Sequence, residues 1–221
     1  MLVSLTTVAF AESTSNTNPS FSTEELKATS QKVLQLVKEG KEDEAANLPE
    51  VKALKKTLES NTELANEYFS SLEAAQAVKE NIKISIGKNE SKIIEFEDGS
   101  FIQVSATTTQ INQPTRDPGD IIYKARDHYQ YTIWGIFPAA TCNLYTDYNY
   151  GNYYVKITDT NATQRTNLPA WSTGCSSSIV SNTRSKGIFN FQDPAGSFGI
   201  TLITDIIPGP FTVTVKHSPI K

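Results

Sequence analysis

The sequence predicts an α+β protein, with an N-terminal helical segment followed by an antiparallel β-sandwich or barrel. Apolar residues recur at helical spacing up to about residue 80 and at every second position beyond it. Charge changes as well: residues 1–100 contain 17 Asp and Glu against 11 Lys and Arg, whereas residues 101–221 contain 7 against 9. Eight of the nine tyrosines fall between Tyr123 and Tyr154. These differences indicate two structural parts.

The N-terminus has the features of an export signal. The apolar stretch 2–10 runs into the small-residue pattern Ala9-Phe10-Ala11, which predicts cleavage near Ala11. The stretch is far shorter than the roughly 20 apolar residues that span a bilayer, so no transmembrane segment is expected. The basic residues that open a signal peptide are missing before Leu2, and we therefore expect synthesis to start upstream of Met1. The expected location is secreted or cell-envelope associated; a hydrophobic tail without an export role is the alternative.

The helical region is marked by its caps. Ser22 and Glu25 form a capping box, in which each side chain can bind the backbone N–H of the other residue. Gly40 is typical of the residue that follows a helix, and Pro49 can open a second helix at its first turn. A broad apolar face over residues 62–80 predicts a third helix. This region is either a lid on the main domain or a partner-binding hairpin or pro-region.

The β-rich part begins with a predicted hairpin. Alternating apolar residues flank Asp98-Gly99, a pair that favours a type I′ turn. The segment 106–120 has two prolines and no periodicity, which predicts a linker or long loop and a domain boundary. Short alternating segments separated by Gly, Pro, Asn and Asp follow, and they predict strands at Tyr129–Ile136, Thr141–Thr146, Tyr153–Thr158, Ser178–Asn182, Ile188–Gln192, Phe198–Asp205 and Phe211–Lys216. Such spacing without intervening helices favours a sandwich or barrel.

The predicted organisation therefore has six parts. In chain order these are a signal-peptide remnant (1–11), a flexible spacer (12–21), a helical region (22–81), a β-hairpin region (82–105), a linker or long loop (106–120) and a sandwich-like domain (121–221).

The two cysteines favour a disulfide. Cys142 and Cys175 are the only pair, and an even count in an exported protein usually forms a bridge. The alternative is a catalytic thiol, because Ser172-Thr173-Gly174-Cys175 is similar to the S-x-G-C core of L,D-transpeptidases, enzymes that cross-link the cell wall. Ser177 stands where that family has an arginine, and no His-Gly pair precedes the cysteine. The alternative would require His128 or His217 beside Cys175.

Aromatic residues supply the candidate binding surface. Tyrosines crowd around the turn-like segment Asn149–Asn152, and a tyrosine combines a flat apolar face with a polar tip that suits glycans or protein surfaces. The alternative is a set of tyrosines that stabilise a sheet through cross-strand packing. The predicted binding residues are Tyr145, Tyr148, Tyr150, Tyr153 and Trp171.

Other chemistry has no support in the sequence. Two histidines are few for a catalytic zinc site, and motifs for metalloproteases, serine hydrolases and phosphate binding are missing. The seven Asp of the β-rich part fall mostly in predicted turns, where they commonly bind backbone N–H groups. A net charge of −4 gives no reason to expect nucleic acid as a partner. No cofactor or metal is expected.

In outline the chain resembles uncharacterised exported proteins of Gram-positive bacteria. The general layout and the Glu97-Asp98-Gly99-Ser100 hairpin carry this resemblance, which implies no activity and no site residues. The leading hypothesis is a non-enzymatic binding module for an extracellular or cell-envelope partner, a glycan or a protein, which it contacts through the tyrosine-rich hairpin. The alternatives are a cell-wall-acting enzyme with a cysteine nucleophile and a secreted toxin or antimicrobial factor with a helical pro-region.

Overall fold

The computed structural model describes residues 22–79, 84–117, 120–168, 171–193 and 196–220. The predicted signal-peptide remnant and spacer lie outside these residues. Among the helices described, none is long and apolar enough to cross a membrane.

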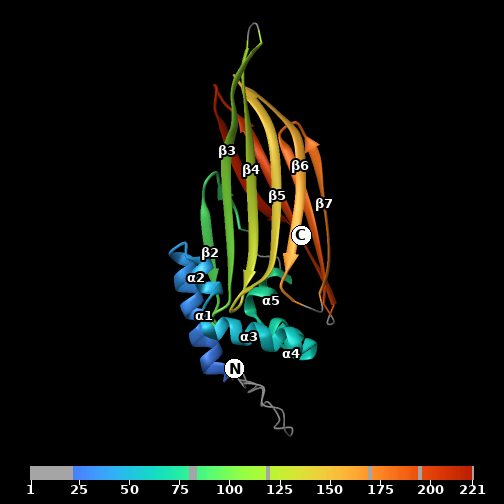
Figure 1. The fold of residues 1–221 in the computed structure, drawn as a ribbon. Coiled ribbons are helices and arrows are strands. Elements are labelled where there is room, and N and C mark those ends of the chain that lie inside the picture. The colour runs from blue at the N-terminus through green and yellow to red at the C-terminus, as the bar shows by residue number, and fades with distance from the viewer. Residues whose placement is uncertain (1–21, 80–83, 118–119, 169–170, 194–195, 221) are drawn as a thin grey trace, which may run out of the picture.

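Five helices form one end of the molecule (Figure 1). They are α1 (Thr23–Lys38), α2 (Glu42–Ala46), α3 (Pro49–Ser60), α4 (Thr62–Ser71) and α5 (Glu73–Lys79). The predicted capping box is confirmed: Glu25 N donates to Ser22 Oγ at 3.2 Å, and Ser22 N donates to the Glu25 carboxylate at 2.9 Å. Hydrogen bonds from these partners lower the pKa of Glu25. Gly40 follows α1 with a φ of 71°, and Pro49 occupies the first turn of α3, as predicted.

The helix predicted over residues 62–80 is two helices. Leu72 has an extended backbone, with φ −64° and ψ 124°, and separates α4 from α5. The first N–H groups of α5 bind side chains from the sheet, with Glu73 N donating to Asp98 at 2.9 Å and Ala74 N to Ser100 at 3.0 Å. A helix N-terminus has free N–H groups that require acceptors. The distant turn therefore supplies the cap that local sequence could not reveal.

Ten strands form two five-stranded antiparallel sheets that pack as a sandwich. The strands are β1 (Ile86–Gly87), β2 (Ser91–Glu95), β3 (Phe101–Asp117), β4 (Asp120–Trp134), β5 (Pro138–Gly151), β6 (Tyr154–Thr166), β7 (Ser172–Ser181), β8 (Arg184–Asp193), β9 (Gly196–Pro208) and β10 (Val213–Ile220). One sheet has the order β1-β10-β9-β8-β7 and the other β2-β3-β4-β5-β6. The structure confirms the predicted α+β class.

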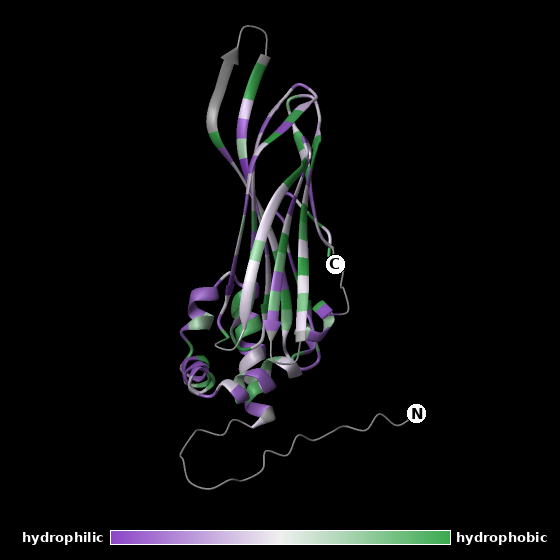
Figure 2. Cartoon of the chain, turned by 90° about the vertical axis from the view of Figure 1, so that its right-hand side faces the viewer, coloured by the Kyte–Doolittle hydropathy of each residue, from purple (hydrophilic) through white to green (hydrophobic). Residues whose placement is uncertain are grey.

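The predicted linker at 106–120 is wrong. Most of this segment belongs to β3, which pairs with β4 from Phe101 through Asp117, and irregularities in register occur near Asn112. The many Thr and Gln side chains of the segment suit a strand whose outer face is polar, because threonine is a good strand former. The β3–β4 hairpin projects beyond the other turns (Figures 1 and 2). No domain boundary separates the hairpin region from the sandwich.

The turn at Asp98-Gly99 also differs from the prediction. Gly99 has a φ of 84°, but Asp98 does not have a positive φ, as both central residues of a type I′ turn would. Gly99 N donates to Phe96 O at 3.1 Å, and Phe96 N donates to Ser100 O at 3.0 Å. This is a three-residue hairpin loop closed by a left-handed glycine. The Asp98 carboxylate thereby becomes free to accept from α5.

The interior contains two apolar cores. The larger core joins the helices to the lower part of the sandwich, with Phe69 of α4 against Phe137 and Trp171. The smaller core lies toward the opposite end and consists of Ala125, Tyr148, Val155, Ile157, Ile206 and Val215. The edges β6 and β7 are joined by side chains rather than by a backbone ladder: Ser177 Oγ donates to Thr160 O at 3.0 Å and Cys175 Sγ to Ala162 O at 3.3 Å.

Candidate functional site

The turns that connect β5 to β6, β7 to β8 and β9 to β10 lie at the end of the sandwich that is opposite the helices, and strands β3 and β4 extend past them (Figure 1). We call the described residues of these turns and of the adjoining strand ends, those of β3 and β4 included, the hairpin end. Among the residues whose exposure is described, every exposed large hydrophobic side chain lies at the hairpin end. These side chains are Ile111, Ile121, Tyr153, Tyr154, Ile179, Val180, Ile207 and Phe211. Single exposed apolar residues are ordinary, but their gathering at one end makes that end the candidate contact surface.

Two of these side chains are held in a special backbone conformation. Tyr153 and Phe211 have φ values of 52° and 55°, in the left-handed region that bulky residues rarely adopt. Both are well exposed, at 68% and 49%. The third positive φ at a non-glycine residue is that of Asn89, a residue type that adopts it readily. Backbone strain of this kind persists where the surroundings impose it, and it is concentrated at functional sites.

The surroundings of Tyr153 and Phe211 are visible in the hydrogen bonds of the two turns. Asn152 and Pro210 form an isolated antiparallel bridge between the sheets. Tyr153 N donates to Gly209 O at 2.9 Å, and Gly209 N donates to Thr212 O at 2.9 Å. These bonds join the β5–β6 turn to the β9–β10 turn. The two turns that carry these aromatic side chains are therefore hydrogen-bonded to each other.

The five predicted binding residues do not form one surface. Tyr148 is fully buried in the smaller core, and Trp171 is buried against Phe69, Phe191 and Phe198. Burial, and after it the negative charge of Asp127, raises the pKa of the Tyr148 phenol. Neither side chain can contact a partner in this fold, which corrects the prediction for both.

The remaining three predicted tyrosines occupy different faces. Tyr145 is half-buried on the outer face of its sheet, where it stacks on His128 with ring centroids 4.4 Å apart. Tyr150 is half-buried and stacks on Tyr123 at 5.1 Å. Alternate residues of a strand face opposite sides, so Tyr145 and Tyr148 could not share a face. Only Tyr153 of the predicted set belongs to the hairpin end as an exposed side chain.

Phe211 and the exposed aliphatic residues of the hairpin end were not among the predicted binding residues. A signal for Phe211 was present, because it opens the predicted strand Phe211–Lys216 directly after Pro208-Gly209-Pro210. An apolar side chain at the edge of a tight turn has few neighbours to cover it. The convergence of these segments depends on strand order, which spacing does not reveal.

The predicted disulfide between Cys142 and Cys175 is absent, and both residues are free thiols. Cys142 points into the core, where burial raises the pKa of its thiol well above the usual value. Cys175 lies on an exposed strand, and its thiol donates to Ala162 O. One side chain faces the interior and the other faces the edge of the neighbouring sheet.

The histidines do not form the pair with Cys175 that a thiol enzyme would need. His128 Nε2 is 2.9 Å from Asn143 Oδ1, and its ring stacks on Tyr145. His217 is fully buried, with Nε2 at 2.6 Å from Asp127 Oδ2. The described residues contain no cluster of three or more His, Cys, Asp or Glu that could hold a metal ion.

Asp127 and His217 belong to a polar layer between the sheets. Asp127, expected as a turn residue, lies in the middle of β4, and Thr108 Oγ1 donates to its second carboxylate oxygen at 2.9 Å. Asp127 pairs with Thr146 in one sheet, and His217 pairs with Thr204, which pairs with Ser185, in the other. The Thr146 and Ser185 hydroxyls are 2.6 Å apart. The polar layer consists of these five buried residues: Asp127, Thr146, Ser185, Thr204 and His217. It separates the two apolar cores.

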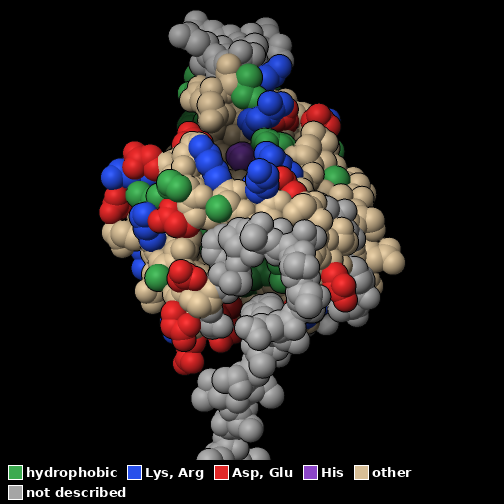
Figure 3. Space-filling view, turned by 60° about the horizontal axis from the view of Figure 1, so that its bottom comes forward, with side chains coloured by type: hydrophobic (Ala, Val, Ile, Leu, Met, Phe, Trp, Pro, Cys, Tyr) green, Lys and Arg blue, Asp and Glu red, His purple; other side chains and the backbone are tan. Residues whose placement is uncertain are grey.

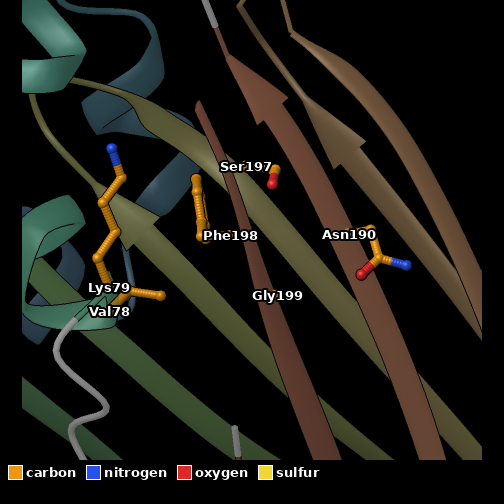
Figure 4. Close-up of a pocket in the computed structure, with 6 residues that line it drawn as sticks. All are labelled: Val78, Lys79, Asn190, Ser197, Phe198 and Gly199. Atoms are coloured by element: carbon orange, nitrogen blue, oxygen red, sulfur yellow. The ribbon is translucent and has the colours of Figure 1, made fainter. Parts of the chain in front are cut away.

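One hollow of about 320 Å³ lies at the helical end, between α5 and strands β8 and β9 (Figure 4). Among the described residues that line it, Lys79 is the charged one, and its ammonium group lies 5.7 Å from the centre of the Phe198 ring. The other lining residues are Val78, Asn190, Ser197 and Gly199. The described lining supplies no carboxylate, thiol or imidazole.

No protein-family model matches the chain, and curated proteins give no match. Among solved structures, the chain is similar to the hypothetical protein lmo2686 from Listeria monocytogenes EGD-e. That similarity covers 63% of this chain and 96% of the Listeria chain, with 16% sequence identity and a TM-score of 0.33.

Proposed function

We propose that this chain is an exported, non-enzymatic binding module that contacts an extracellular or cell-envelope partner with its hairpin end. The observation that carries the proposal is the confinement of the described exposed large hydrophobic side chains to the hairpin end. The left-handed backbone at Tyr153 and Phe211 supports it, because selection for stability alone favours Gly or Asn at such positions. Export is supported by the apolar stretch that ends in Ala9-Phe10-Ala11.

The contact differs from the hairpin first predicted from the sequence. Substituting Tyr148 would remove a buried ring from the smaller core and would test folding rather than binding. Tyr153 and Phe211 are the residues to substitute, because their side chains are exposed. Asn is the suitable replacement, since it adopts a positive φ more easily than Tyr or Phe.

The proposal is tested by capture of the full chain on isolated cell envelopes, purified peptidoglycan, polysaccharides and extracellular proteins. The double variant Tyr153→Asn, Phe211→Asn should lose most of the binding that the parent shows, while it folds as well as the parent. Tyr145→Ser is the matched control, since it removes an aromatic ring from the middle of a sheet face and should leave binding unchanged. Equal binding by the double variant and the parent would show that the hairpin end is not the contact.

A further inference from the structure

We propose that the hairpin end docks on a lipid bilayer that carries anionic headgroups. This inference rests on the proposed function and names the class of partner. Bilayers, protein surfaces and small ligands differ in the shape and charge that they require of a binding site, and the described residues of the hairpin end distinguish among them.

The shape of the hairpin end does not suit a small ligand. Small-molecule sites are concave and bury most of the ligand. Among the described residues, a hollow of this kind is lined from α5, β8 and β9 at the helical end. At the hairpin end, by contrast, the apolar side chains stand on separate turns and strand ends. A fluid interface can receive such side chains one by one, because lipids rearrange around each of them.

The composition of the hairpin end matches the interfacial zone of a bilayer. Aliphatic side chains come from three of the hairpins, with Ile111, Ile179 and Ile207 among them, and aromatic side chains come from the β5–β6 and β9–β10 turns. Tyrosine is enriched where membranes meet water, since its ring is apolar and its hydroxyl stays hydrated. Tyr153 and Tyr154 are adjacent and both exposed, so their hydroxyls remain accessible to water or headgroups.

Basic side chains lie directly behind the apolar turns. Lys124 and Lys156 flank Asn149 on adjacent strands, because Lys124 pairs with Asn149 and Asn149 pairs with Lys156. Both lysines are exposed, and Lys156 is two residues from Tyr154. Lysines near a membrane surface are attracted by anionic lipids. Two nearby arginines form ion pairs within the protein. Arg126 donates two hydrogen bonds to Asp147, and Arg184 donates two to Asp205.

The helical end has an excess of acidic residues. Residues 23–79, which form the helices, contain eleven Asp and Glu against eight Lys. Acidic side chains are spread over this end, which faces the viewer in Figure 3. An anionic surface would repel the helical end and attract the lysines behind the turns. In the resulting orientation the long axis of the sandwich is perpendicular to the membrane plane, with the hairpin end toward the lipid.

The test is sedimentation of the full chain with vesicles of phosphatidylglycerol and phosphatidylcholine, and with vesicles of phosphatidylcholine alone. The parent should bind the anionic vesicles, and salt should weaken that binding. The double variant Tyr153→Asn, Phe211→Asn should lower the partition coefficient at least about tenfold, as expected from removing two large apolar side chains from the interface. Tyr145→Ser should bind like the parent.

A second pair of variants tests the charge. Lys124→Gln with Lys156→Gln should weaken binding to anionic vesicles about tenfold and leave binding to phosphatidylcholine unchanged. Lys52→Gln with Lys56→Gln, on the helical end, is the matched control and should have no effect. If the two pairs weaken binding equally, the lysines behind the turns do not orient the molecule and the docking geometry is wrong.

The two proposals fail in different ways. A parent chain that does not sediment with either kind of vesicle overturns bilayer docking. If the double variant at Tyr153 and Phe211 still loses capture on cell envelopes in that case, the proposed function stands with a protein or glycan as partner. If the double variant retains both vesicle binding and envelope capture, both proposals are wrong.

Discussion

At the scale of single residues, Tyr153 and Phe211 have a backbone conformation that lowers stability. The left-handed backbone conformation costs a bulky residue roughly 1–2 kcal/mol, a cost that glycine does not have. Neither ring is buried enough to offset that cost by packing within the fold. This cost supports the proposal that the two aromatic side chains contact a partner outside the molecule.

The backbone strain at these two residues gives the first prediction. Tyr153→Asn and Phe211→Asn should each raise the free energy of unfolding by about 0.5–1 kcal/mol, because Asn reduces the backbone strain. Urea unfolding of each single variant measures the change. Tyr154→Asn is the control, because Tyr154 begins a strand and its φ is not positive; it should not be stabilised. Destabilisation by Tyr153→Asn or Phe211→Asn would mean that the rings pack more than their exposure shows.

The cysteines give a second prediction at the same scale. A thiol reacts through its thiolate and needs access to the reagent. Cys175 is exposed, whereas Cys142 is buried with a raised pKa. One thiol per chain should therefore react with a thiol reagent at neutral pH in the native protein, and two should react in urea. Cys175→Ser should abolish the native reaction. Failure of both thiols to react in urea would show that the bridge forms in the isolated protein.

Residue positions were predictable only where local chemistry decides them. The capping box at Ser22 and Glu25 depends on four consecutive residues, and the structure confirms it. The tyrosines depend on which face of a strand is buried, and alternation gives the period but not the side that is covered. Tyr148 faces the smaller core because the other sheet lies over it. The residues of that sheet in the smaller core, Ile206 and Val215, lie on β9 and β10, far along the chain from Tyr148.

At the scale of elements, the helices are fixed to the sandwich by specific bonds. Tyr68 of α4 accepts a hydrogen bond from Ile136 N at 3.0 Å. Gly135 lies beside the same contact, and a β-carbon there would be 2.7 Å from the Tyr68 oxygen and 2.9 Å from Leu72. The connection between β4 and β5 can therefore approach α4 closely only with glycine at 135.

The third prediction concerns this contact. Tyr68→Phe should lower the free energy of unfolding by about 1–2 kcal/mol, because Ile136 N–H would lose its acceptor. Gly135→Ala should cost about 1–3 kcal/mol, because the methyl group would displace α4. Urea unfolding followed by circular dichroism measures both. Tyr154→Phe removes a hydroxyl from an exposed turn residue and should change stability little. If Tyr68→Phe were equally neutral, the bond to Ile136 would contribute nothing to docking of the helices.

The strands show why the linker prediction failed. Residues 106–120 have no apolar alternation, since the inward side chains of β3 in this stretch include Ala106 and Thr108. Ala106 is small and Thr108 donates to Asp127 in the polar layer. A strand that faces a polar interior shows no hydrophobic period, although its backbone ladder is continuous. Pro114 added to the impression of a loop, and it lies where the register with β4 shifts.

At the scale of the whole molecule, Asp127 and His217 connect the two sheets through a bond that crosses the interior. Both side chains are fully buried, and His217 Nδ1 has no partner among the described residues. A buried charged group is costly unless its partner is present. Removing one partner should therefore destabilise the fold strongly, whereas replacing both with apolar residues should be tolerated.

A double-mutant cycle provides the fourth prediction. Asp127→Leu and His217→Leu should each lower the free energy of unfolding by about 3–5 kcal/mol, because each leaves a polar group buried without its partner. The double variant should cost far less than the sum of the two, since no unpaired carboxylate or imidazole remains. Denaturant unfolding of all four proteins measures the coupling. Additive losses would show that the two residues do not act as a pair.

The α+β class and the helical front followed by a β-rich part were within reach of the sequence, because periodicity and composition change along the chain. The order of strands in the two sheets was not, since it depends on contacts between segments far apart. The hairpin end is a product of that order. Its exposed residues come from residues 111 to 211, and no local window contains more than a fraction of them.

The two cores on either side of the polar layer should differ in local stability. Above it lies a core of six residues, and below it lies the larger core that includes the helices. Regions with few buried apolar contacts open locally at a free energy below that of global unfolding. We expect backbone amides around Tyr148 and Ile157 to exchange with deuterated solvent faster than those around Tyr131 and Leu202. The hairpin end, where we propose the contact, can then open locally while the helical end remains folded.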